Sequence, residues 1–422
     1  MISGRITRRK LLYGSCLLPP LGARALAAQS YRVGAGRSSD AYTATNRAID
    51  ASSEWSQLGI AGRRVIIKPN LVVPALPESG KVVDSQVTRA VADRALAAGA
   101  ASVDIVESGP ALDFDACGYG FFRTYHPKVR LVDLQNEPSE LTPVPSGWAY
   151  GAIYTAPMVV DGNAVFISIG KLKTHTNSIA SLSQKNLIGI SSPPNYATGQ
   201  PETRWAMHDR GLDQAILDLN HLRPTHFALV DGVWGMEGWG PLFGTPVRMD
   251  TVLAGRNAVA VDRVGLALMG IPQYAVRHLI YASLAGLGPP DLSSVQVAGD
   301  TLAPRAFQRP TAPANFDPPS VSPSVFRPAA GASAEISVRY WAPCFRDITI
   351  QRLFDGSPEV QHVRTVVASG YRQSGRESAI WNGRDDQGAI APPGRYAVLV
   401  RAFELTRTVR HADAISWVVV GA

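Results

Sequence analysis

Seven prolines crowd the interval between residues 304 and 328, and this interval constrains the fold more than any other feature of the chain. Alanine and serine lie among these prolines without apolar periodicity, which is typical of a semi-extended linker. A chain of 422 residues, 45% of them hydrophobic, is longer than one core comfortably serves. We therefore expect two folded domains, residues 29–301 and 334–422, joined by a linker at 302–333.

Short apolar strands alternate with helical segments before this linker. Residues 63–69 have the pattern of a buried strand, residues 86–98 that of an Ala-rich helix, and residues 102–107 that of the next strand. Residues 164–169 and 226–231 continue the series as core strands. This order predicts an α/β domain with a mostly parallel, doubly wound sheet. Ligands of such sheets bind at the carboxyl ends of the strands.

The pattern after the linker changes to short alternating strands, which predicts a small all-β sandwich. Trp381, the turn residues up to Gly388, and the run from Pro392 to Tyr396 resemble the Ig-like domain of flagellar hook-capping proteins. The signature of that domain is close to W-x-G-x-D-x-x-G followed by P-x-G-x-Y. The resemblance covers residues 334–422 and implies an accessory module without chemistry of its own.

The first 28 residues have the features of an export signal. Thr7-Arg8-Arg9-Lys10-Leu11-Leu12 is a twin-arginine pattern, a short apolar stretch follows it, and Ala25-Leu26-Ala27 is a small-residue cleavage site. The apolar stretch is far shorter than the roughly 20 residues that span a bilayer, so no permanent membrane span is expected. We expect the twin-arginine export machinery to deliver the mature chain to the periplasm or the exterior.

Charge and cysteine content exclude several partners and cofactors. The formal charge is +7, and removal of the five basic residues of the predicted signal leaves +2 on the mature chain. Nucleic acid is therefore not an expected partner. Cys117 and Cys344 are the only cysteines after the signal, too few for a Cys-ligated iron–sulfur cluster or a Cys-rich zinc site. Each is expected to be a buried or half-buried free thiol.

Lysine and amide side chains gather at two predicted strand ends. Lys68 and Asn70 close one strand, and Lys171, Lys173 and His175 alternate after another. An extended chain places the last three on one face. Such a cluster suits a carboxylate or a phosphate group. The alternatives are an ordinary strand-end turn and a scattered set of exposed lysines.

A second group of candidates follows along the chain. Lys185 and Asn186 lie on a predicted helix end and would join the anion site. His208 stands ahead of a predicted helix, and a histidine there can be a general base, a metal ligand or a packed ring. With His175 it gives two imidazoles, and Asp231 would supply a third ligand for a divalent metal.

The segment from Asp231 to Pro241 is rich in glycine and follows a predicted strand. It fits neither the dinucleotide-binding fingerprint nor the P-loop. We expect a loop in which Gly235 and Gly238 let the backbone approach a ligand closely. Glu237 would then act as an acid or a base, or would bind metal together with Asp231.

Taken in order, these blocks resemble the protein family called domain of unknown function 362. The blocks are K-P-N, K-x-K-T-H, K-N-L-I-G, an isolated His, D-G-x-x-G-M-E-G-x-G-P, and A-V-D ahead of M-G, at Lys68–Asn70, Lys171–His175, Lys185–Gly189, His208, Asp231–Pro241 and Ala260–Gly270. The resemblance spans residues 60–300 and implies an α/β fold with its site in these blocks. The lactate racemase superfamily, where Lys and His residues at strand ends hold a nickel cofactor, offers an architectural analogy only.

We therefore expect an exported enzyme that acts on a small anionic substrate by acid–base chemistry. The expected catalytic residues are Lys173, His175, His208 and Glu237; the expected substrate or cofactor ligands are Lys68, Asn70, Lys185, Asn186, Gly235 and Gly238; the expected metal ligands are His175, His208 and Asp231. A metal- or cofactor-dependent isomerase or oxidoreductase is one form of this hypothesis. The alternatives are a non-catalytic extracytoplasmic protein that binds an anion or a metal complex, and a surface module working through its C-terminal domain.

Overall fold

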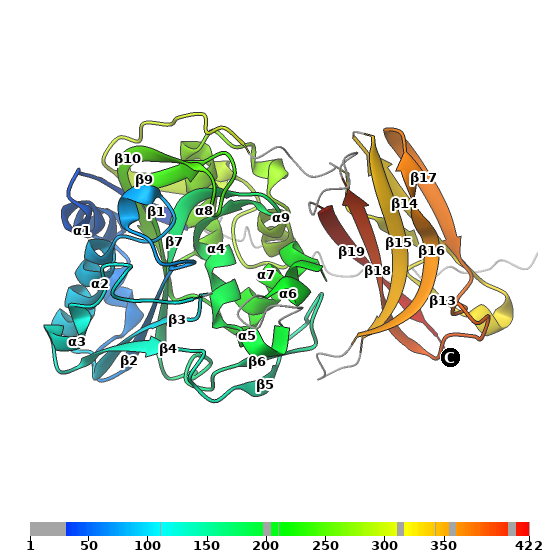
Figure 1. Cartoon of the computed structure of the whole chain (residues 1–422), viewed down its shortest axis with the longest axis horizontal. Coiled ribbons are helices and arrows are strands. Elements are labelled where there is room, and N and C mark those ends of the chain that lie inside the picture. Colours follow the sequence, from blue (N-terminus) through cyan, green and yellow to red (C-terminus); the bar gives the residue numbers. More distant parts are fainter. Residues whose placement is uncertain are drawn as a thin grey trace, which may run out of the picture.

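A large α/β part is followed along the chain by a smaller all-β part, as the computed structural model in Figure 1 shows. The structure describes residues 31–109, 111–196, 204–209, 211–309, 316–341, 343–353, 360–403 and 411–421. The expected export signal, residues 1–28, lies outside the described residues.

One sheet, of nine strands over the described residues, forms the centre of the α/β part. Its strands are β1 (Tyr31–Arg37), β2 (Arg64–Pro69), β3 (Ser102–Glu107), β4 (Val129–Asp133), β7 (Val165–His175), β8 (Ile179–Ser181), β9 (Phe227–Glu237), β10 (Thr245–Gly255) and β11 (Val295–Gly299). Their order is β11-β1-β10-β9-β7-β2-β3-β4, with β8 paired to β7. Strand β10 is antiparallel to both of its neighbours, and β8 is antiparallel to β7. The predicted α/β class is therefore confirmed, and the sheet is mixed.

Both faces of β2 are buried, because adjacent residues of a strand point to opposite sides of a sheet. Val65 and Ile67 belong to a core shared with α1 (Ala41–Ser52) and α2 (Ser85–Ala97), whereas Ile66 belongs to a core shared with α7 (Leu212–Leu222). A strand buried on both faces is a continuous apolar run rather than an alternating one. That is why residues 63–69 could be recognised as a core strand from the sequence.

The helices and a short separate hairpin surround this sheet. The helices are α1 (Ala41–Ser52), α2 (Ser85–Ala97), α3 (Phe122–Tyr125), α4 (Leu182–Lys185), α5 (Pro193–Tyr196), α6 (Trp205–Asp209), α7 (Leu212–Leu222), α8 (Ala258–Leu268) and α9 (Arg277–Leu284); the 3₁₀ helix η3 is Asn186–Ile190, and the hairpin strands are β5 (Glu140–Pro143) and β6 (Ala152–Thr155). The helix predicted at residues 86–98 forms as α2. It begins there because the Asp84 side chain accepts a hydrogen bond from the backbone N–H of Gln86.

The carboxyl-terminal part consists of two sheets. Its strands are β12 (Ser320–Ser322), β13 (Val325–Phe326), β14 (Ala334–Tyr340), β15 (Cys344–Leu353), β16 (Val360–Arg372), β17 (Gly375–Trp381), β18 (Gly394–Phe403) and β19 (His411–Val420). One sheet has the order β12-β14-β17 and the other β13-β19-β18-β15-β16. Trp381 is 1% exposed and packs between Phe326 and Tyr396. Strands β12 and β13 lie inside the expected linker, so regular structure resumes before residue 334. Cys117 and Cys344 are buried free thiols, as expected.

The sheet order changes direction between β2 and β7. From β2 the chain continues to β3 and β4 on one side, whereas β9 follows β7 on the other side. Both strands are parallel and adjacent, with Lys68 opposite Ser168 and Pro69 opposite Ile169. Ligands of open α/β sheets bind outside the carboxyl ends of the strands at such a point. The carboxyl ends of β2, β3 and β7 are therefore where this sheet is expected to bind a ligand.

Candidate functional site

Four of the seven lysines of the chain lie near this point, on β2, β7 and α4. Lys68, Lys171 and Lys173 are at most 1% exposed, and Lys185 is partly buried. Lysine is almost never fully buried without a partner, because its ammonium group loses hydration. The environment of each amine therefore shows which charges the protein itself compensates.

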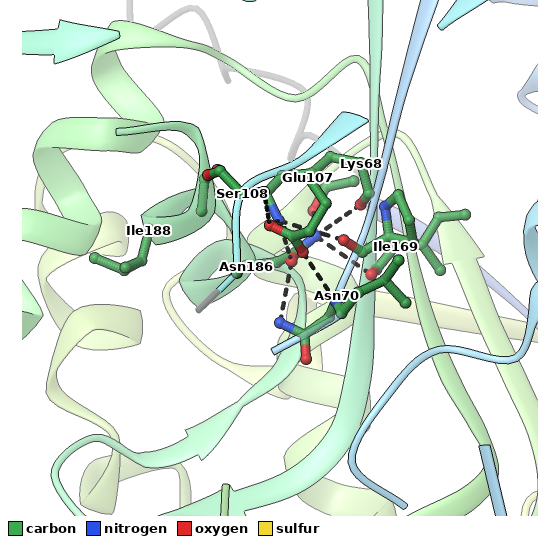
Figure 2. A network of polar contacts seen from close by, with 12 residues as sticks. Lys68, Asn70, Glu107, Ser108, Ile169, Asn186 and Ile188 are labelled. Atoms are coloured by element: carbon green, nitrogen blue, oxygen red, sulfur yellow. Dashed lines mark hydrogen bonds and ion pairs between the residues drawn. The ribbon is translucent and has the colours of Figure 1, made fainter. Parts of the chain in front are cut away.

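Lys68 is compensated by Glu107, at the end of the neighbouring strand β3. The Lys68 Nζ lies 2.9 and 2.8 Å from the two carboxylate oxygens of Glu107, and both side chains are buried (Figure 2). Glu107 also accepts hydrogen bonds from the backbone N–H groups of Leu71 (2.9 Å) and Ser108 (2.8 Å). Burial lowers the pKa of Lys68, and the Glu107 charge opposes that shift. This ion pair belongs to the protein interior.

Asn186 joins the same network from the start of η3. Its Oδ1 accepts from Lys68 Nζ (3.0 Å) and from Asn70 Nδ2 (3.2 Å), and its Nδ2 donates to the Lys68 carbonyl (2.8 Å) and to Ser168 Oγ (3.0 Å). The structure thus brings Lys68, Asn70 and Asn186 together, as the motifs predicted (Figure 2). They bond mainly to one another. The buried Oδ1 of Asn70 is the exception, without a partner among the described residues.

Gly189 allows η3 to approach this ion pair. A Cβ at residue 189 would lie 2.5 Å from Glu107 Oε1 and 2.6 Å from Lys68 Nζ, too close for any side chain. The hydroxyl of Ser108 donates to the Gly189 carbonyl (2.6 Å), and Arg204 donates to the Ser108 carbonyl (2.9 Å) and to the carbonyl of Ser191 (3.0 Å). The glycine of the K-N-L-I-G block therefore allows η3 to pack closely against Lys68 and Glu107.

Lys171 is compensated by Asp231 of the adjacent strand β9. Its Nζ lies 2.7 Å from Asp231 Oδ2, and both side chains are fully buried. Asp231 also accepts from the backbone N–H groups of Asp84 (2.9 Å) and Val233 (2.9 Å). Burial and the Asp231 charge raise the pKa of Asp84. Asp231 therefore forms an ion pair with Lys171 and also binds the backbone of Asp84, the residue that caps α2.

Lys173 and Lys185 are different, because no carboxylate of the described residues lies within ion-pair distance of either amine. Lys173 Nζ donates to the backbone carbonyl of Lys81 (2.6 Å). Burial and the charges of Lys185 and Lys171 hold the pKa of Lys173 well below its usual value. Burial also lowers the pKa of Lys185 to about 8. Two buried amines near the switch point therefore have no carboxylate within ion-pair distance among the described residues.

His175 and His208 lie beside these cations with stacked rings whose centroids are 6.1 Å apart. The backbone N–H groups of Asn177 (3.1 Å) and Ser178 (3.3 Å) donate to His175 Nδ1, so a neutral His175 ring carries its proton on Nε2. His208 Nδ1 lies 3.0 Å from the Arg204 carbonyl, which can only accept, so the His208 lone pair is on Nε2. Burial and the Lys185 charge hold the pKa of His175 well below its usual value. The two rings are thus a proton donor and a proton acceptor.

Three predicted site residues have other roles. Glu237 ion-pairs with Arg305 (3.1 Å) and accepts from the backbone N–H of Gln308 (2.8 Å), which fastens residues 305–308 to the end of β9. Gly235 lies within β9, which continues to Glu237, and Gly238 follows the strand with a positive φ. A Cβ at Gly235 would lie 2.7 Å from the Leu172 carbonyl, and the Gly238 N–H donates to the Gln308 carbonyl.

The three expected metal ligands do not form a set. Asp231 is bound to Lys171, while the two histidines lie further along β7 and on α6. Over the part of the chain that the structure describes, no group of three His, Cys, Asp or Glu side chains is arranged to hold a metal ion. The donors present therefore do not fit the metal site predicted from the sequence.

The sequence interpretation missed several residues of the site. Glu107 and Arg204 were not selected, although an acid at the carboxyl end of an apolar strand was a visible signal for Glu107. Asp262 was not selected either. It lies inside α8, and its carboxylate accepts from the backbone N–H groups of Ser183 (2.8 Å) and Gln184 (3.0 Å). Asp262 thereby holds the start of α4, the helix that carries Lys185.

Comparison with known proteins agrees with the motif pattern. Residues 65–267 match the model of the family described as Domain of unknown function (DUF362). The DUF362 match includes the blocks that contain Lys68, Lys173, Lys185 and His208, so the resemblance to this family is confirmed over that range. A thylakoid-associated protein from Synechocystis sp. is 23% identical over 234 residues, which are 54% of this chain and 70% of that protein.

Two solved structures show a remote likeness to this chain. The sporulation control protein Spo0M from Bacillus subtilis has a TM-score of 0.18 and 12% identity, over 26% of this chain and 50% of that one. The alkylpurine DNA glycosylase AlkC from Pseudomonas fluorescens has a TM-score of 0.19 and 13% identity, over 39% and 46%. The chain thus matches about half the length of each, and TM-scores this low carry no argument. Over the described residues, no helix is both long and apolar enough to cross a membrane.

Proposed function

We propose that this chain is an exported enzyme that binds a small carboxylate or phosphate through Lys173 and Lys185 and moves a proton through His175 and His208. One observation carries the proposal: the Lys185 charge lowers the pKa of Lys173, and neither amine has a carboxylate within ion-pair distance among the described residues. An anionic ligand would supply the missing charge. The histidine pair favours catalysis over simple capture, because its two rings offer a proton donor and a proton acceptor.

Anion binding should take up a proton at alkaline pH. The pKa of Lys185 is about 8 in the free protein, so at pH 9 most of these amines are neutral. A bound anion favours the charged amine and raises its pKa, so the complex holds more protons than the free protein. We expect inorganic phosphate or malonate to bind at pH 7, to bind more weakly above pH 8, and to take up close to one proton per site at pH 9.

Isothermal titration calorimetry at pH 9 in two buffers of different ionisation enthalpy measures this uptake. The Lys185→Met variant should take up fewer protons than the wild-type protein. Lys128→Met is the matched control, because Lys128 is exposed and lies just before β4, the edge strand of the sheet. If neither phosphate nor malonate binds the wild-type protein, the proposed function is wrong.

The export route is part of this proposal and rests on Thr7–Leu12 and on the small residues before Ala28. Twin-arginine signals require their paired arginines, so replacing Arg8 and Arg9 together by lysine should retain the full-length precursor in the cytoplasm. Cell fractionation and mass measurement of the amino terminus would show this. Release of the double variant in processed form, as efficiently as wild type, would contradict it.

A further inference from the structure

Asp213 on α7 and His278 on α9 form a buried pair that the sequence did not suggest. Asp213 Oδ1 lies 3.0 Å from His278 Nδ1 and accepts the backbone N–H of His278 at 3.2 Å. His278 is 1% exposed. Its Nε2 is buried and has no hydrogen-bond partner among the described residues. A carboxylate and an imidazole are thus oriented toward each other, with the far nitrogen unused.

Both members of the pair adjoin the proposed anion site. The Asp213 charge raises the pKa of Lys185, against the larger effect of burial, and the His278 ring contributes to the low pKa of His175. Helix α7 packs against α4 and η3, the elements that carry Lys185 and Asn186, and α9 packs against α7 (Figure 1). The pair therefore adjoins the site from two helices, whereas Lys68 and Lys173 come from strands β2 and β7.

The hydrogen bond to Asp213 fixes the protonation of the His278 ring. A carboxylate accepts the proton of Nδ1, so the lone pair of neutral His278 is on Nε2. Other buried polar atoms on the same two helices also have no partner within the described part of the chain: the Tyr281 hydroxyl on α9 and the side-chain amide of Gln214 on α7. Buried polar groups are normally satisfied, so several exceptions on two packed helices indicate a polar guest such as water or a ligand hydroxyl.

We propose that Asp213 and His278 form a second proton acceptor of this site and that the anion it binds carries a hydroxyl group. His278 Nε2 accepts the hydrogen bond of that hydroxyl and, during reaction, its proton. The O–H bond breaks, an N–H bond forms, and the electron pair stays on the ligand oxygen. Asp213 then stabilises the resulting imidazolium. This inference rests on the proposed function, since it places His278 against the ligand held by Lys173 and Lys185.

Two probes that differ by one hydroxyl test the inference, malonate and hydroxymalonate. Both should bind through the lysines, and hydroxymalonate should bind roughly tenfold tighter, since a hydrogen bond within a charged pair is worth about that factor. The His278→Gln variant should lose this preference and keep its affinity for malonate. Binding constants come from calorimetry of the mature full chain at pH 7.

Histidine NMR of the ¹⁵N-labelled protein reads the ring directly, and His278→Gln identifies its signals among the eight histidines of the chain. In the free protein His278 should be the tautomer protonated on Nδ1, and hydroxymalonate should move its Nε2 signal while malonate does not. His226, whose Nδ1 accepts the Phe166 N–H just before β9, is the internal control and should not respond. If both anions bind equally well and the His278 signals stay unmoved, the inference is overturned while the proposed function stands. If neither anion binds, both fail.

Discussion

Replacing Glu107 by glutamine should destabilise the α/β part by about 3–5 kcal/mol, the usual cost of removing one partner of a buried ion pair. The variant has nearly the same volume, so no cavity forms. It leaves Lys68 buried without a countercharge, and it turns an amide N–H₂ toward the backbone donor of Leu71 or of Ser108, both of which now bond to the carboxylate. Urea unfolding of the mature chain, followed by far-ultraviolet circular dichroism at pH 7, measures the loss.

Two further variants make this prediction specific. Asp50→Asn breaks the pair of Asp50 with Arg94, in which Asp50 is 64% exposed, and should cost less than about 1 kcal/mol. The double variant Lys68→Met/Glu107→Leu removes both charges and should recover much of the stability lost in Glu107→Gln. If Glu107→Gln is as mild as Asp50→Asn, the pair does not hold the ends of β2 and β3 together.

The sequence predicted which motif blocks lie close together, but not the contacts that their residues make. Lys68, Asn70 and Asn186 are neighbours, as the K-P-N and K-N-L-I-G blocks indicated. Their partner Glu107 could not be chosen from the sequence, because the pairing depends on β3 lying beside β2 and on a glycine at residue 189. Three of the residues expected to bind a ligand, Lys68, Asn70 and Asn186, are therefore bonded to one another.

The Asp231–Pro241 segment shows why local composition misled. Glycine is frequent in turns, so its glycines predicted a loop. In the structure Gly235 lies within β9. A Cβ at this position would lie 2.7 Å from the Leu172 carbonyl, so only glycine fits there. Asp231 and Glu237 then lie six residues apart along one strand, about 20 Å, and have different partners. A long-range contact invisible in the sequence thus decided between a loop and a strand.

Within the described part of the chain, Lys173 and Lys185 have no carboxylate within ion-pair distance, so replacing them should weaken anion binding and increase the stability of the fold. The double variant Lys173→Met/Lys185→Met should lose roughly 10²- to 10⁴-fold in affinity for phosphate or malonate, since each charged hydrogen bond contributes about 1.5–3 kcal/mol. The same variant should be more stable than wild type at pH 7 by about 1 kcal/mol or more, because burial without a countercharge penalises both amines. Calorimetry and urea unfolding measure the two effects, with Lys128→Met as the control that changes neither.

The stability gain should shrink as the pH rises. The pKa of Lys185 is about 8 in the folded chain and 10.5 in an unperturbed lysine, so between these values the unfolded wild-type chain binds more protons than the folded one. Wild-type stability therefore increases with pH across this window, and the penalty carried by Lys185 disappears. A double variant that is less stable than wild type at pH 7, or that binds anions normally, would show that these lysines are structural. Loss of affinity with gain of stability would show that the protein maintains two unfavourable charges for a ligand.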